Sequence, residues 1–311
     1  MNPIYLVFSG QGSQTVGMGY DFYQQYDFVK KIYDIAEAVS NYPIKEISFS
    51  NESLLNQTQF TQVSLFTFYQ AVLAILNHYQ VESSASLGLS LGEYGAYLDN
   101  DVFDFQTGIN IVKNRAIYME EATKLYPGKM AAVIGINANH LEALIQKHHS
   151  PVTIANYNTH EQLVLSALVD DIDALSSIIK ETSSARIIPL NTSCAFHSTY
   201  MTHAKSLFAN FLSTVELNEP TKNLWLNTTG HLYQGDIKEV MAEQIVSSVK
   251  FYQTIENISK NEEPIWIEVG PKKVLLEMIK KINPFADVHH ISNMSSLKST
   301  LDYLGVNHGI I

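Results

Sequence analysis

The segment Gly88-Leu-Ser90-Leu-Gly92 combines residue types and spacing that could do chemistry. It fits the G-x-S-x-G pattern, in which a serine stands on a tight turn between a strand and a helix. Glycines flank the serine because such a turn leaves no room for larger side chains beside it. Backbone N–H groups at the start of the next helix stabilise an oxyanion. The pattern predicts Ser90 as a nucleophile; the alternative is an ordinary capping serine.

A serine hydroxyl needs a base to take its proton, and the usual base is a histidine. The chain has 11 histidines, most of them in polar runs such as His148-His149 and His289-His290. His197 differs, because it follows Cys194-Ala-Phe just beyond a predicted strand. We interpret His197 as the candidate base, and a surface histidine without a catalytic role remains the alternative.

An arginine in the middle of an apolar helix face is the third candidate. Spacings of three, four and seven residues place one set on a single face: Gly108, Ile111, Val112, Arg115, Ala116 and Met119. A guanidinium in that position is costly unless an anion pairs with it. The anion is either a bound substrate or a structural partner such as a nearby Glu, and the sequence leaves both open.

Two further patterns carry less weight. Gly10-Gln-Gly12 follows a strand, but a dinucleotide-binding G-x-G-x-x-G turn needs a glycine where Thr15 stands, and Gly17 is out of phase. Cys194 shares a short segment with His197, and two residues so close in an extended strand point in diverging directions. We therefore expect Cys194 to be a small core residue.

These candidates require a framework of alternating strands and helices. Strands at residues 4–8 and 84–89 each run into a glycine-containing turn, and a later strand covers residues 264–269. Helical spacing is found at residues 22–38, 63–76, 105–122, 207–215 and 237–249. The alternation predicts an α/β fold, hydrolase-like, with a mainly parallel sheet flanked by helices on both faces.

The middle of the chain has a different order of predicted elements. Its expected elements are a strand at 130–136, a helix at 139–147, strands at 152–155 and 162–166, a helix at 171–182 and a strand at 186–190. The order β-α-β-β-α-β is that of a ferredoxin-like unit. We predict a small ferredoxin-like domain of residues 127–193, inserted into a large α/β catalytic domain of residues 1–126 and 194–311.

The composition is that of a folded, acidic protein. Of its 311 residues, 46% are hydrophobic and 11% aromatic, enough for one large domain or one carrying an insertion. The formal net charge of −11 argues against nucleic acid and anionic membranes as partners. A single cysteine allows no internal disulfide, the N-terminus lacks signal-peptide features, and no run of about 18 apolar residues is present. We expect a cytoplasmic protein.

Together these motifs resemble the malonyl-CoA:acyl-carrier-protein transacylase family, which includes the acyltransferase domains of polyketide synthases. The resemblance covers nearly the whole chain in the family's order. It rests on Phe8-Ser-Gly-Gln-Gly-Ser-Gln14, similar to F-P-G-Q-G-S-Q; Gly88-Leu-Ser-Leu-Gly-Glu-Tyr94, similar to G-H-S-L-G-E-Y; Ala195-Phe-His-Ser198, similar to A-F-H-S; Gln244 before Val249 and Phe251; and Glu268-Val-Gly-Pro271, similar to E-V-G-P.

The resemblance implies roles for five residues in the reaction. Ser90 would be the nucleophile and His197 the base. The side-chain carbonyl of Gln244 would orient the imidazole. The backbone N–H groups of Gln11 and Leu91 would form the oxyanion hole. A neutral glutamine stabilises an imidazolium less than a carboxylate does, which a reactive thioester substrate tolerates.

The resemblance also implies two substrate contacts and reveals three departures. Arg115 stands where the family places the arginine that grips the malonyl carboxylate, and Phe196 would restrict the pocket to an unbranched malonyl unit. The departures are Ser9 for Pro, Leu89 for His and Lys272 for Gly. Because a residue adjacent to Ser90 on the turn points away from the nucleophile, Leu89 should spare the chemistry. It would alter local packing, and it leaves His197 as the only candidate base in these motifs.

The resemblance implies a malonyl-CoA:acyl-carrier-protein S-malonyltransferase working through a Ser90 ester. Its partners would be malonyl-CoA and a phosphopantetheinylated acyl carrier protein, with no metal or redox cofactor, and the enzyme would be a monomer. The rival enzyme class is an esterase or thioesterase, which uses water as acceptor; in those enzymes the acid normally lies between serine and histidine, whereas Gln244 follows His197. The rival of another class is a non-catalytic binding protein with the same fold.

Overall fold

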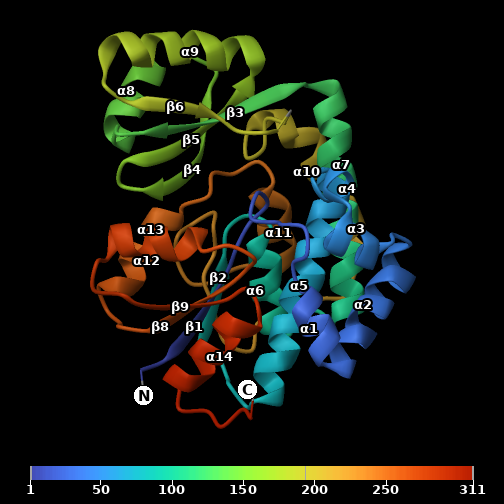
Figure 1. The fold of residues 1–311 in the computed structure, drawn as a ribbon. Coiled ribbons are helices and arrows are strands. Elements are labelled where there is room, and N and C mark those ends of the chain that lie inside the picture. Colours follow the sequence, from blue (N-terminus) through green and yellow to red (C-terminus); the bar gives the residue numbers. More distant parts are fainter. Residues whose placement is uncertain (1, 193, 310–311) are drawn as a thin grey trace.

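The computed structural model describes residues 2–192 and 194–309, which form two stacked parts (Figure 1). The elements are β1 (Ile4–Phe8), α1 (Tyr20–Gln25), α2 (Asp27–Ser40), α3 (Ile44–Ser50), α4 (Glu52–Leu55), α5 (Thr58–His78), β2 (Ala85–Gly88), α6 (Gly92–Asp99), α7 (Phe105–Leu125), β3 (Gly128–Ile134), α8 (Ala138–Lys147), β4 (Thr153–Thr159), β5 (Gln162–Leu168), α9 (Val169–Thr182), β6 (Arg186–Pro189), η1 (Thr199–Met201), α10 (Thr202–Ser213), β7 (Asn223–Leu224), α11 (Ile237–Gln244), α12 (Phe251–Ser259), β8 (Ile265–Val269), α13 (Val274–Ile282), β9 (Asp287–Ile291) and α14 (Met294–Tyr303).

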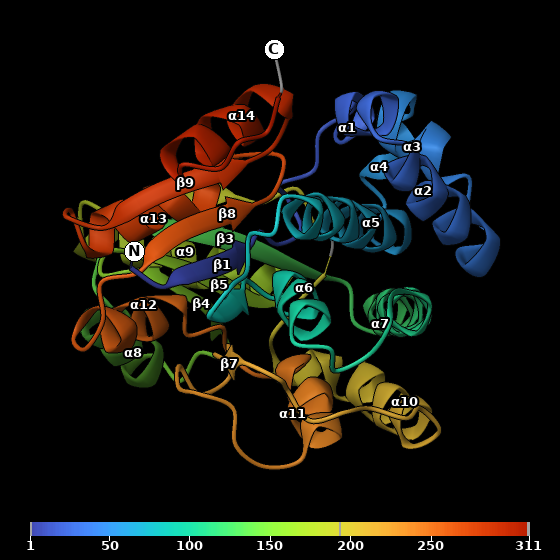
Figure 2. The same cartoon turned by 90° about the horizontal axis from the view of Figure 1, so that it is seen from below.

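The larger part is built on a parallel sheet with strand order β7-β2-β1-β8-β9. The residues of its central strand β1 are all apolar or aromatic, as expected for a strand that is covered on both faces. Leu6 and Phe8 belong to the core shared with α5 and α6, whereas Tyr5 and Val7 belong to the core shared with α12 and α13. Figure 2 shows these two groups of helices on opposite sides of the sheet. The predicted fold class is confirmed.

Helix α5 is the longest apolar element of this part. By length and composition its 21 residues could cross a membrane, but 72% of its most apolar window is buried inside the protein. The polar residues Thr61, Gln62 and Thr67 are buried with it and so add side-chain hydrogen bonds to an apolar packing surface. We therefore describe α5 as a core helix.

The smaller part is an antiparallel sheet with strand order β4-β5-β3-β6, covered by α8 and α9. Its elements follow the predicted order β-α-β-β-α-β, and it has an apolar core of its own that includes Val133, Leu141, Leu165 and Leu175. The predicted domain limits at residues 1, 193 and 311 lie outside the described residues, and the division into domains stays a prediction.

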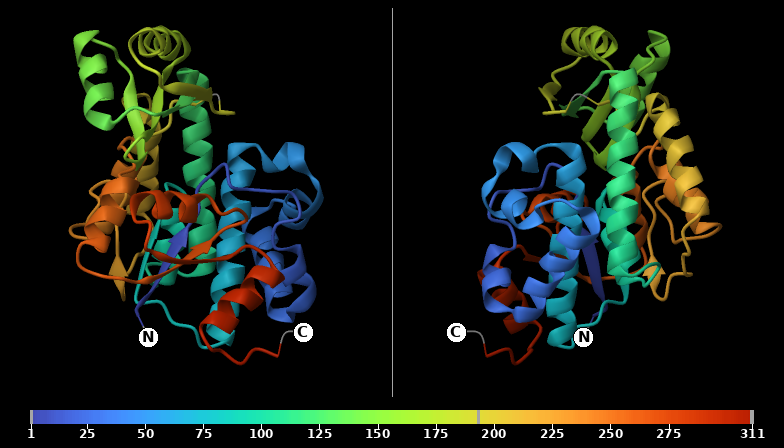
Figure 3. Two further views of the ribbon diagram at one scale, coloured as in Figure 1. Left: turned by 60° about the vertical axis from the view of Figure 1, so that its left-hand side comes forward. Right: turned by 90° about the vertical axis from the view of Figure 1, so that its right-hand side faces the viewer.

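Helix α7 connects the two parts. It stands upright beside α5 and α10 and leads directly into β3 (Figure 3). A second connection joins β4 to the segment after α11, where the N–H of Tyr157 donates to the Val249 oxygen at 2.9 Å and the N–H of Val249 donates to the Ala155 oxygen at 2.8 Å. These links fix the antiparallel sheet above the carboxyl ends of the parallel strands.

Two expected helices differ from the structure in their limits. The helix predicted at 22–38 is divided into α1 and α2, because Tyr26 is extended with φ −120° and ψ 120°. The helix predicted at 237–249 ends at Gln244, and the chain continues irregularly through Ser247. Beyond Val269 the sequence predicts no element, whereas the structure contains α13, β9 and α14.

Candidate active site

Ser90 stands on a turn that requires its flanking glycines. Between the end of β2 at Gly88 and the start of α6 at Gly92, Ser90 has a φ of 54°, in the left-handed region that L-residues rarely adopt. A Cβ on Gly88 would lie 2.0 Å from the carbonyl carbon of Gly92, and a Cβ on Gly92 would lie 2.0 Å from the main-chain oxygen of Phe8. Larger residues at either position would force the turn open.

His197 lies beside this serine. Its Nε2 is 2.7 Å from Ser90 Oγ, and its Nδ1 is 3.0 Å from the main-chain oxygen of Gln244 and 2.9 Å from that of Ser247. Because carbonyl oxygens only accept hydrogen bonds, Nδ1 must carry the proton. Nε2 is then left as the acceptor for the serine hydroxyl, which is the arrangement of a nucleophile and its general base.

The surroundings keep this imidazole neutral. His197 is 3% exposed. Burial and the charge of Arg115 lower the pKa of His197 from 6.5 to about 4, and the hydrogen bonds to the Gln244 and Ser247 carbonyls oppose this shift. At neutral pH the ring is therefore uncharged, and its Nε2 can take a proton.

The side chain of Gln244 makes other contacts than the predicted one. Its Oε1 accepts from Arg115 Nη2 at 3.0 Å, and its Nε2 donates to the main-chain oxygen of Ser90 at 3.1 Å. The prediction that the side-chain carbonyl orients the imidazole is therefore wrong. Helix α11 ends at Gln244, which leaves the last main-chain carbonyls without helical partners, and those of Gln244 and Ser247 accept from His197 instead.

Arg115 is the only cation among the described residues that contacts Ser90, and it is 1% exposed. Its Nη1 donates to Gln62 Oε1 at 2.8 Å, and its Nη2 reaches Gln244 Oε1 at 3.0 Å and Ser90 Oγ at 3.3 Å. The guanidinium carbon lies 5.0 Å from the centroid of the Tyr94 ring.

The partners of this guanidinium are neutral. In the part of the chain that the structure describes, no carboxylate forms an ion pair with Arg115, and its buried Nε has no hydrogen-bond partner. A structural glutamate, the alternative that the sequence left open, is therefore not its direct partner. A buried cation with neutral partners favours an anionic ligand.

The two main-chain N–H groups predicted to bind an oxyanion, those of Gln11 and Leu91, have no hydrogen-bond acceptor within the described residues. Leu91 is the residue before the first turn of α6, and Gln11 lies in the loop after β1. Neither main-chain N–H donates a hydrogen bond to any of residues 2–192 or 194–309. The Gln11 side chain is held by bonds to Thr58 Oγ1 at 3.1 Å and from Gln62 Nε2 at 3.4 Å. This geometry suits an oxyanion hole, although the role itself stays a prediction.

A cleft of about 600 Å³ is lined by Ser90, His197, Arg115 and Gln11. It lies between the two parts: the loop of residues 9–14 lines it from below, and the faces of β3, β4 and β5 line it from above. Phe196 and Leu89 both contribute to its wall beside Ser90. Lys272 stands at its rim, where Nζ donates to the Gly12 oxygen at 3.1 Å.

Cys194 takes no part in the site. It is 5% exposed and belongs to the large apolar core, where its sulfur accepts from Thr123 Oγ1 at 2.9 Å. The expectation of a small core residue is confirmed.

Two residues that contact Arg115 or Ser90 are not among the sequence-based candidates. Gln62 binds Arg115 from α5, just before the predicted helix at 63–76, and a polar residue on that buried face was a detectable signal. Asn227 accepts a hydrogen bond from the Ser90 N–H at 2.6 Å. It follows a two-residue strand, too short to be found by periodicity, so no sequence pattern marked it.

The site can transfer an acyl group to and from a serine. Ser90 is placed to act as the nucleophile and His197 to take its proton. The N–H groups of Gln11 and Leu91 have no partner among the described residues and are available to an oxyanion. The Arg115 guanidinium adjoins the hydroxyl, so an acyl group that carries its own carboxylate would find a bidentate partner there.

Comparison with known proteins agrees with this chemistry. A family model described as "Acyl transferase domain" matches residues 5–298. A polyketide biosynthesis malonyl CoA-acyl carrier protein transacylase, PksC of Bacillus subtilis, is 35% identical over 286 residues, covering 90% of this chain and 97% of that protein. The structure resembles that of a malonyl CoA-acyl carrier protein transacylase from Clostridium perfringens, with a TM-score of 0.92, 31% identity and 97% of each chain covered.

A third similarity concerns a complex. A malonyl-transacylase solved together with a holo type II polyketide synthase acyl-carrier protein has a TM-score of 0.92 and 26% identity to this chain, covering 97% of this chain and 99% of that one.

Proposed function

The chain belongs to the acyl transferase domain family, and on that premise we propose that it is a malonyl-CoA:acyl-carrier-protein transacylase. The observation that carries the proposal is the contact of Arg115 with Ser90, 3.3 Å between Nη2 and Oγ. This contact puts a buried cation with no carboxylate partner among the described residues beside the nucleophile, where it can meet the carboxylate of a malonyl group bound to Ser90. The relatives named as malonyl transacylases support the same substrate.

In the first half-reaction Ser90 Oγ attacks the thioester carbonyl carbon of malonyl-CoA while His197 Nε2 takes the hydroxyl proton. The Gln11 and Leu91 N–H groups donate to the oxyanion of the tetrahedral intermediate. The carbon–sulfur bond then breaks, and the imidazolium returns its proton to the coenzyme A sulfur. The products are free coenzyme A and a malonyl ester on Ser90.

The second half-reaction runs the same steps in reverse. The pantetheine thiol of an acyl carrier protein gives its proton to His197 and attacks the ester carbonyl. The bond between the carbonyl carbon and Ser90 Oγ breaks, and the serine recovers the proton. Throughout, Arg115 would hold the malonyl carboxylate by two parallel hydrogen bonds, and the Phe196 ring would leave no room for a branch on the α-carbon.

We also propose the setting in which the enzyme works. The acyl carrier protein is its macromolecular partner, in line with the neighbour solved as such a complex. The protein acts as a monomer in the cytoplasm, without a membrane or nucleic acid as partner. Residues 127–193 act as a small domain that closes one side of the cleft, and residues 1–126 and 194–311 form the catalytic domain.

Active-site labelling tests the proposal. Incubation with malonyl-CoA alone should add one malonyl group to Ser90, detected by mass spectrometry of the peptide, and a holo acyl carrier protein should remove it. Ser90→Ala should form no adduct and keep its circular dichroism spectrum. Rapid loss of the adduct to water would favour a thioesterase, and a wild type that forms no adduct would favour a binding protein.

A further inference from the structure

The segment after β7 touches the serine turn through one residue, Asn227, which is 3% exposed. Its Oδ1 accepts from the Ser90 N–H at 2.6 Å, and its Nδ2 donates to the Gly88 oxygen at 2.5 Å. One amide side chain therefore binds the main chain on both sides of Leu89, the residue that leads into the nucleophile. Asn227 and Ser90 are 137 positions apart, so this contact depends on the fold.

The main chain of Asn227 is fixed as well. Its N–H donates to Glu93 Oε2 at 2.6 Å, and its oxygen accepts from the Lys250 N–H at 2.9 Å. Glu93 lies in the first turn of α6 and also accepts from the Tyr97 hydroxyl. All four polar groups of Asn227 are thus satisfied, and three of them bind the turn that carries Ser90 or the helix that follows it.

The Ser90 turn needs such an external partner. With a φ of 54°, Ser90 is held in a strained conformation that persists only where surrounding contacts impose it. Hydrogen bonds within the turn, from Gly92 N–H to Leu89 and from Glu93 N–H to Ser90, leave the Ser90 N–H unused. Asn227 supplies its acceptor.

We propose that Asn227 is a positioning residue for the nucleophile: it holds the Ser90 turn in the strained conformation that places Oγ 2.7 Å from His197 Nε2. The inference rests on the proposed role of Ser90 as nucleophile. Asn227 touches neither substrate nor the reacting atoms, and its effect is on how often the hydroxyl is aligned with its base. A misplacement of about 1 Å in a reacting group can cost about a hundredfold in rate.

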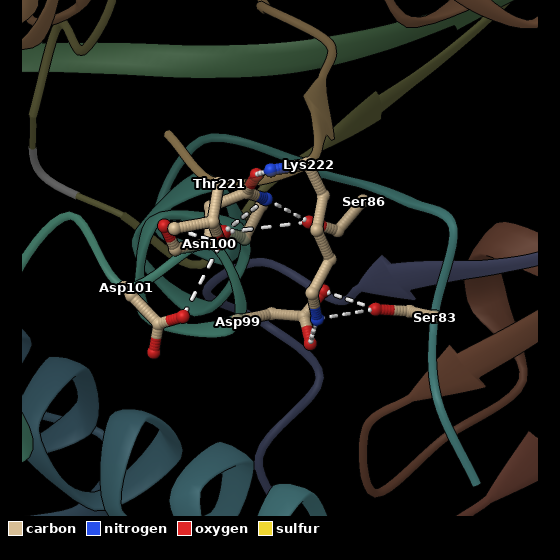
Figure 4. A network of polar contacts seen from close by, with 8 residues as sticks. Ser83, Ser86, Asp99, Asn100, Asp101, Thr221 and Lys222 are labelled. Carbon is tan, nitrogen blue, oxygen red and sulfur yellow. Dashed lines mark hydrogen bonds and ion pairs between the residues drawn. The ribbon is translucent and has the colours of Figure 1, made fainter. Parts of the chain in front are cut away.

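The same strand-turn-helix unit contains a matched control at its other end. Asn100 follows α6 and is fully buried, its Nδ2 donates to Ser86 Oγ at 2.6 Å and to the Ala96 oxygen at 3.0 Å, and its Oδ1 accepts from the Lys222 N–H at 3.0 Å (Figure 4). Asn100 therefore also joins β2, α6 and the chain near β7, but it lies away from the cleft.

Asparagine-to-aspartate substitution at these two positions separates alignment from stability. In Asn227→Asp the carboxylate can still accept the hydrogen bond from the Ser90 N–H. Its second oxygen replaces Nδ2, which donates to the Gly88 oxygen in the wild type, so two oxygen atoms repel each other there. A protonated carboxyl group donates there and restores both bonds. The new acid would be buried beside Glu93, whose own pKa burial raises to about 7, so we expect its pKa to lie above the ordinary range of an aspartate. The Tyr97 hydroxyl bonded to Glu93 is uncharged, and the Arg115 charge, which lowers the pKa of Glu93, opposes this rise.

The readout is the rate of malonyl-Ser90 formation from malonyl-CoA between pH 8 and pH 5.5. His197 stays neutral over this range, and Glu93, whose pKa burial raises to about 7, titrates in every protein compared, so each variant is measured against the wild-type profile. We expect Asn227→Asp to react about ten- to a hundredfold more slowly than wild type at pH 8 and to regain most of that loss at pH 5.5. Asn100→Asp should follow the wild-type profile even if its melting temperature falls as far. Asn227→Ala should lose kcat with little change in KM and recover at neither pH.

Each outcome bears on a single claim. Matching profiles for Asn227→Asp and wild type would overturn the role of Asn227, as would an acid recovery of equal size in Asn100→Asp. If Asn227→Asp does not fold, unchanged kcat in Asn227→Ala would overturn it instead. A wild-type protein that forms no malonyl-Ser90 refutes the proposed function and is recognised before any variant is compared.

Discussion

The main-chain oxygen of Gln244 accepts a hydrogen bond of 3.0 Å from His197 Nδ1, while the side chain of the same glutamine binds Arg115. One residue at the end of α11 therefore fixes the base through its main chain and the cation through its side chain. The two functions are separable, because substitution removes the side chain and leaves the carbonyl.

Gln244→Ala should therefore leave the orientation of His197 intact. We expect transfer of malonyl to fall less than in His197→Ala, which should lose at least about a hundredfold because it lacks the general base. The remaining defect in Gln244→Ala should appear mainly in malonyl affinity, since Arg115 loses one of its partners. Steady-state kinetics of both variants, with circular dichroism as the folding control, measure the difference. Equal damage in the two folded variants would contradict this assignment.

The parts of the site that the sequence predicts are those carried by local patterns. The turn at Ser90 follows from two glycines at fixed spacing, and Arg115 stands out because it interrupts an apolar helix face. The contact of His197 with Gln244 involves a main-chain atom, and side-chain types cannot predict it. It depends on where α11 ends, and helix ends are the least predictable feature of a periodic pattern.

The same distinction between local patterns and long-range contacts applies to the fold. Apolar strands such as β1 and β8 are recognisable because they are buried on both faces. Strand β9 lies at the edge of the sheet, and its polar residues Asp287, His289 and His290 mask the apolar pattern of a strand. Asn227 contacts Ser90 from 137 positions away, and no window of the sequence contains both residues.

The pKa of His197 sets the acid limit of nucleophile reactivity. Burial and the Arg115 charge lower this pKa from 6.5 to about 4, so the ring loses its function as a base only as the pH falls through about 4. The rate at which a neutral sulfonyl fluoride modifies Ser90 should therefore stay nearly constant from pH 8 down to about pH 5. An inflection near 6.5 in folded wild-type protein would contradict the shift.

Removal of the Arg115 charge should move this limit upward. Arg115→Ala lacks the second cause of the depressed pKa, so its inflection should lie at a higher pH than that of the wild type. Because the sulfonyl fluoride carries no carboxylate, this measurement is independent of malonyl binding. Identical inflections would mean that burial alone sets the pKa of His197.

Phe196 should exclude α-branched substrates. The residue is 8% exposed and lines the cleft next to His197, and its main-chain oxygen accepts a hydrogen bond from the Ser166 hydroxyl at 2.7 Å. We expect wild type to prefer malonyl-CoA to methylmalonyl-CoA, and Phe196→Ser to lessen this preference by about tenfold or more, as one added methyl group typically costs 1–3 kcal/mol in a fitted pocket. Competition between the two thioesters measures the ratio. Equal turnover of both by wild type would contradict the prediction.

Arg115 should decide between malonyl and acetyl groups. Its guanidinium is buried with only neutral hydrogen-bond partners, Gln62, Gln244 and Ser90. A carboxylate that enters the cleft can accept two parallel N–H bonds there and also neutralises a costly buried charge, whereas an acetyl group offers neither effect. The selectivity for malonyl therefore depends on this residue.

Arg115→Ala should lower malonyl transfer by at least about a hundredfold, the loss that accompanies removal of a charged hydrogen-bond partner worth several kcal/mol. Acetyl transfer should change little or rise, because the variant no longer buries an unpaired cation. Arg115→Lys should restore only part of the malonyl rate, since an ammonium group keeps the charge but cannot reproduce the planar pair of donors. Rates with both acyl-CoAs for the three proteins decide the matter. If Arg115→Ala reduces both rates by the same factor, Arg115 supports the structure of the site, and the choice of a carboxylate-bearing substrate must rest on other residues.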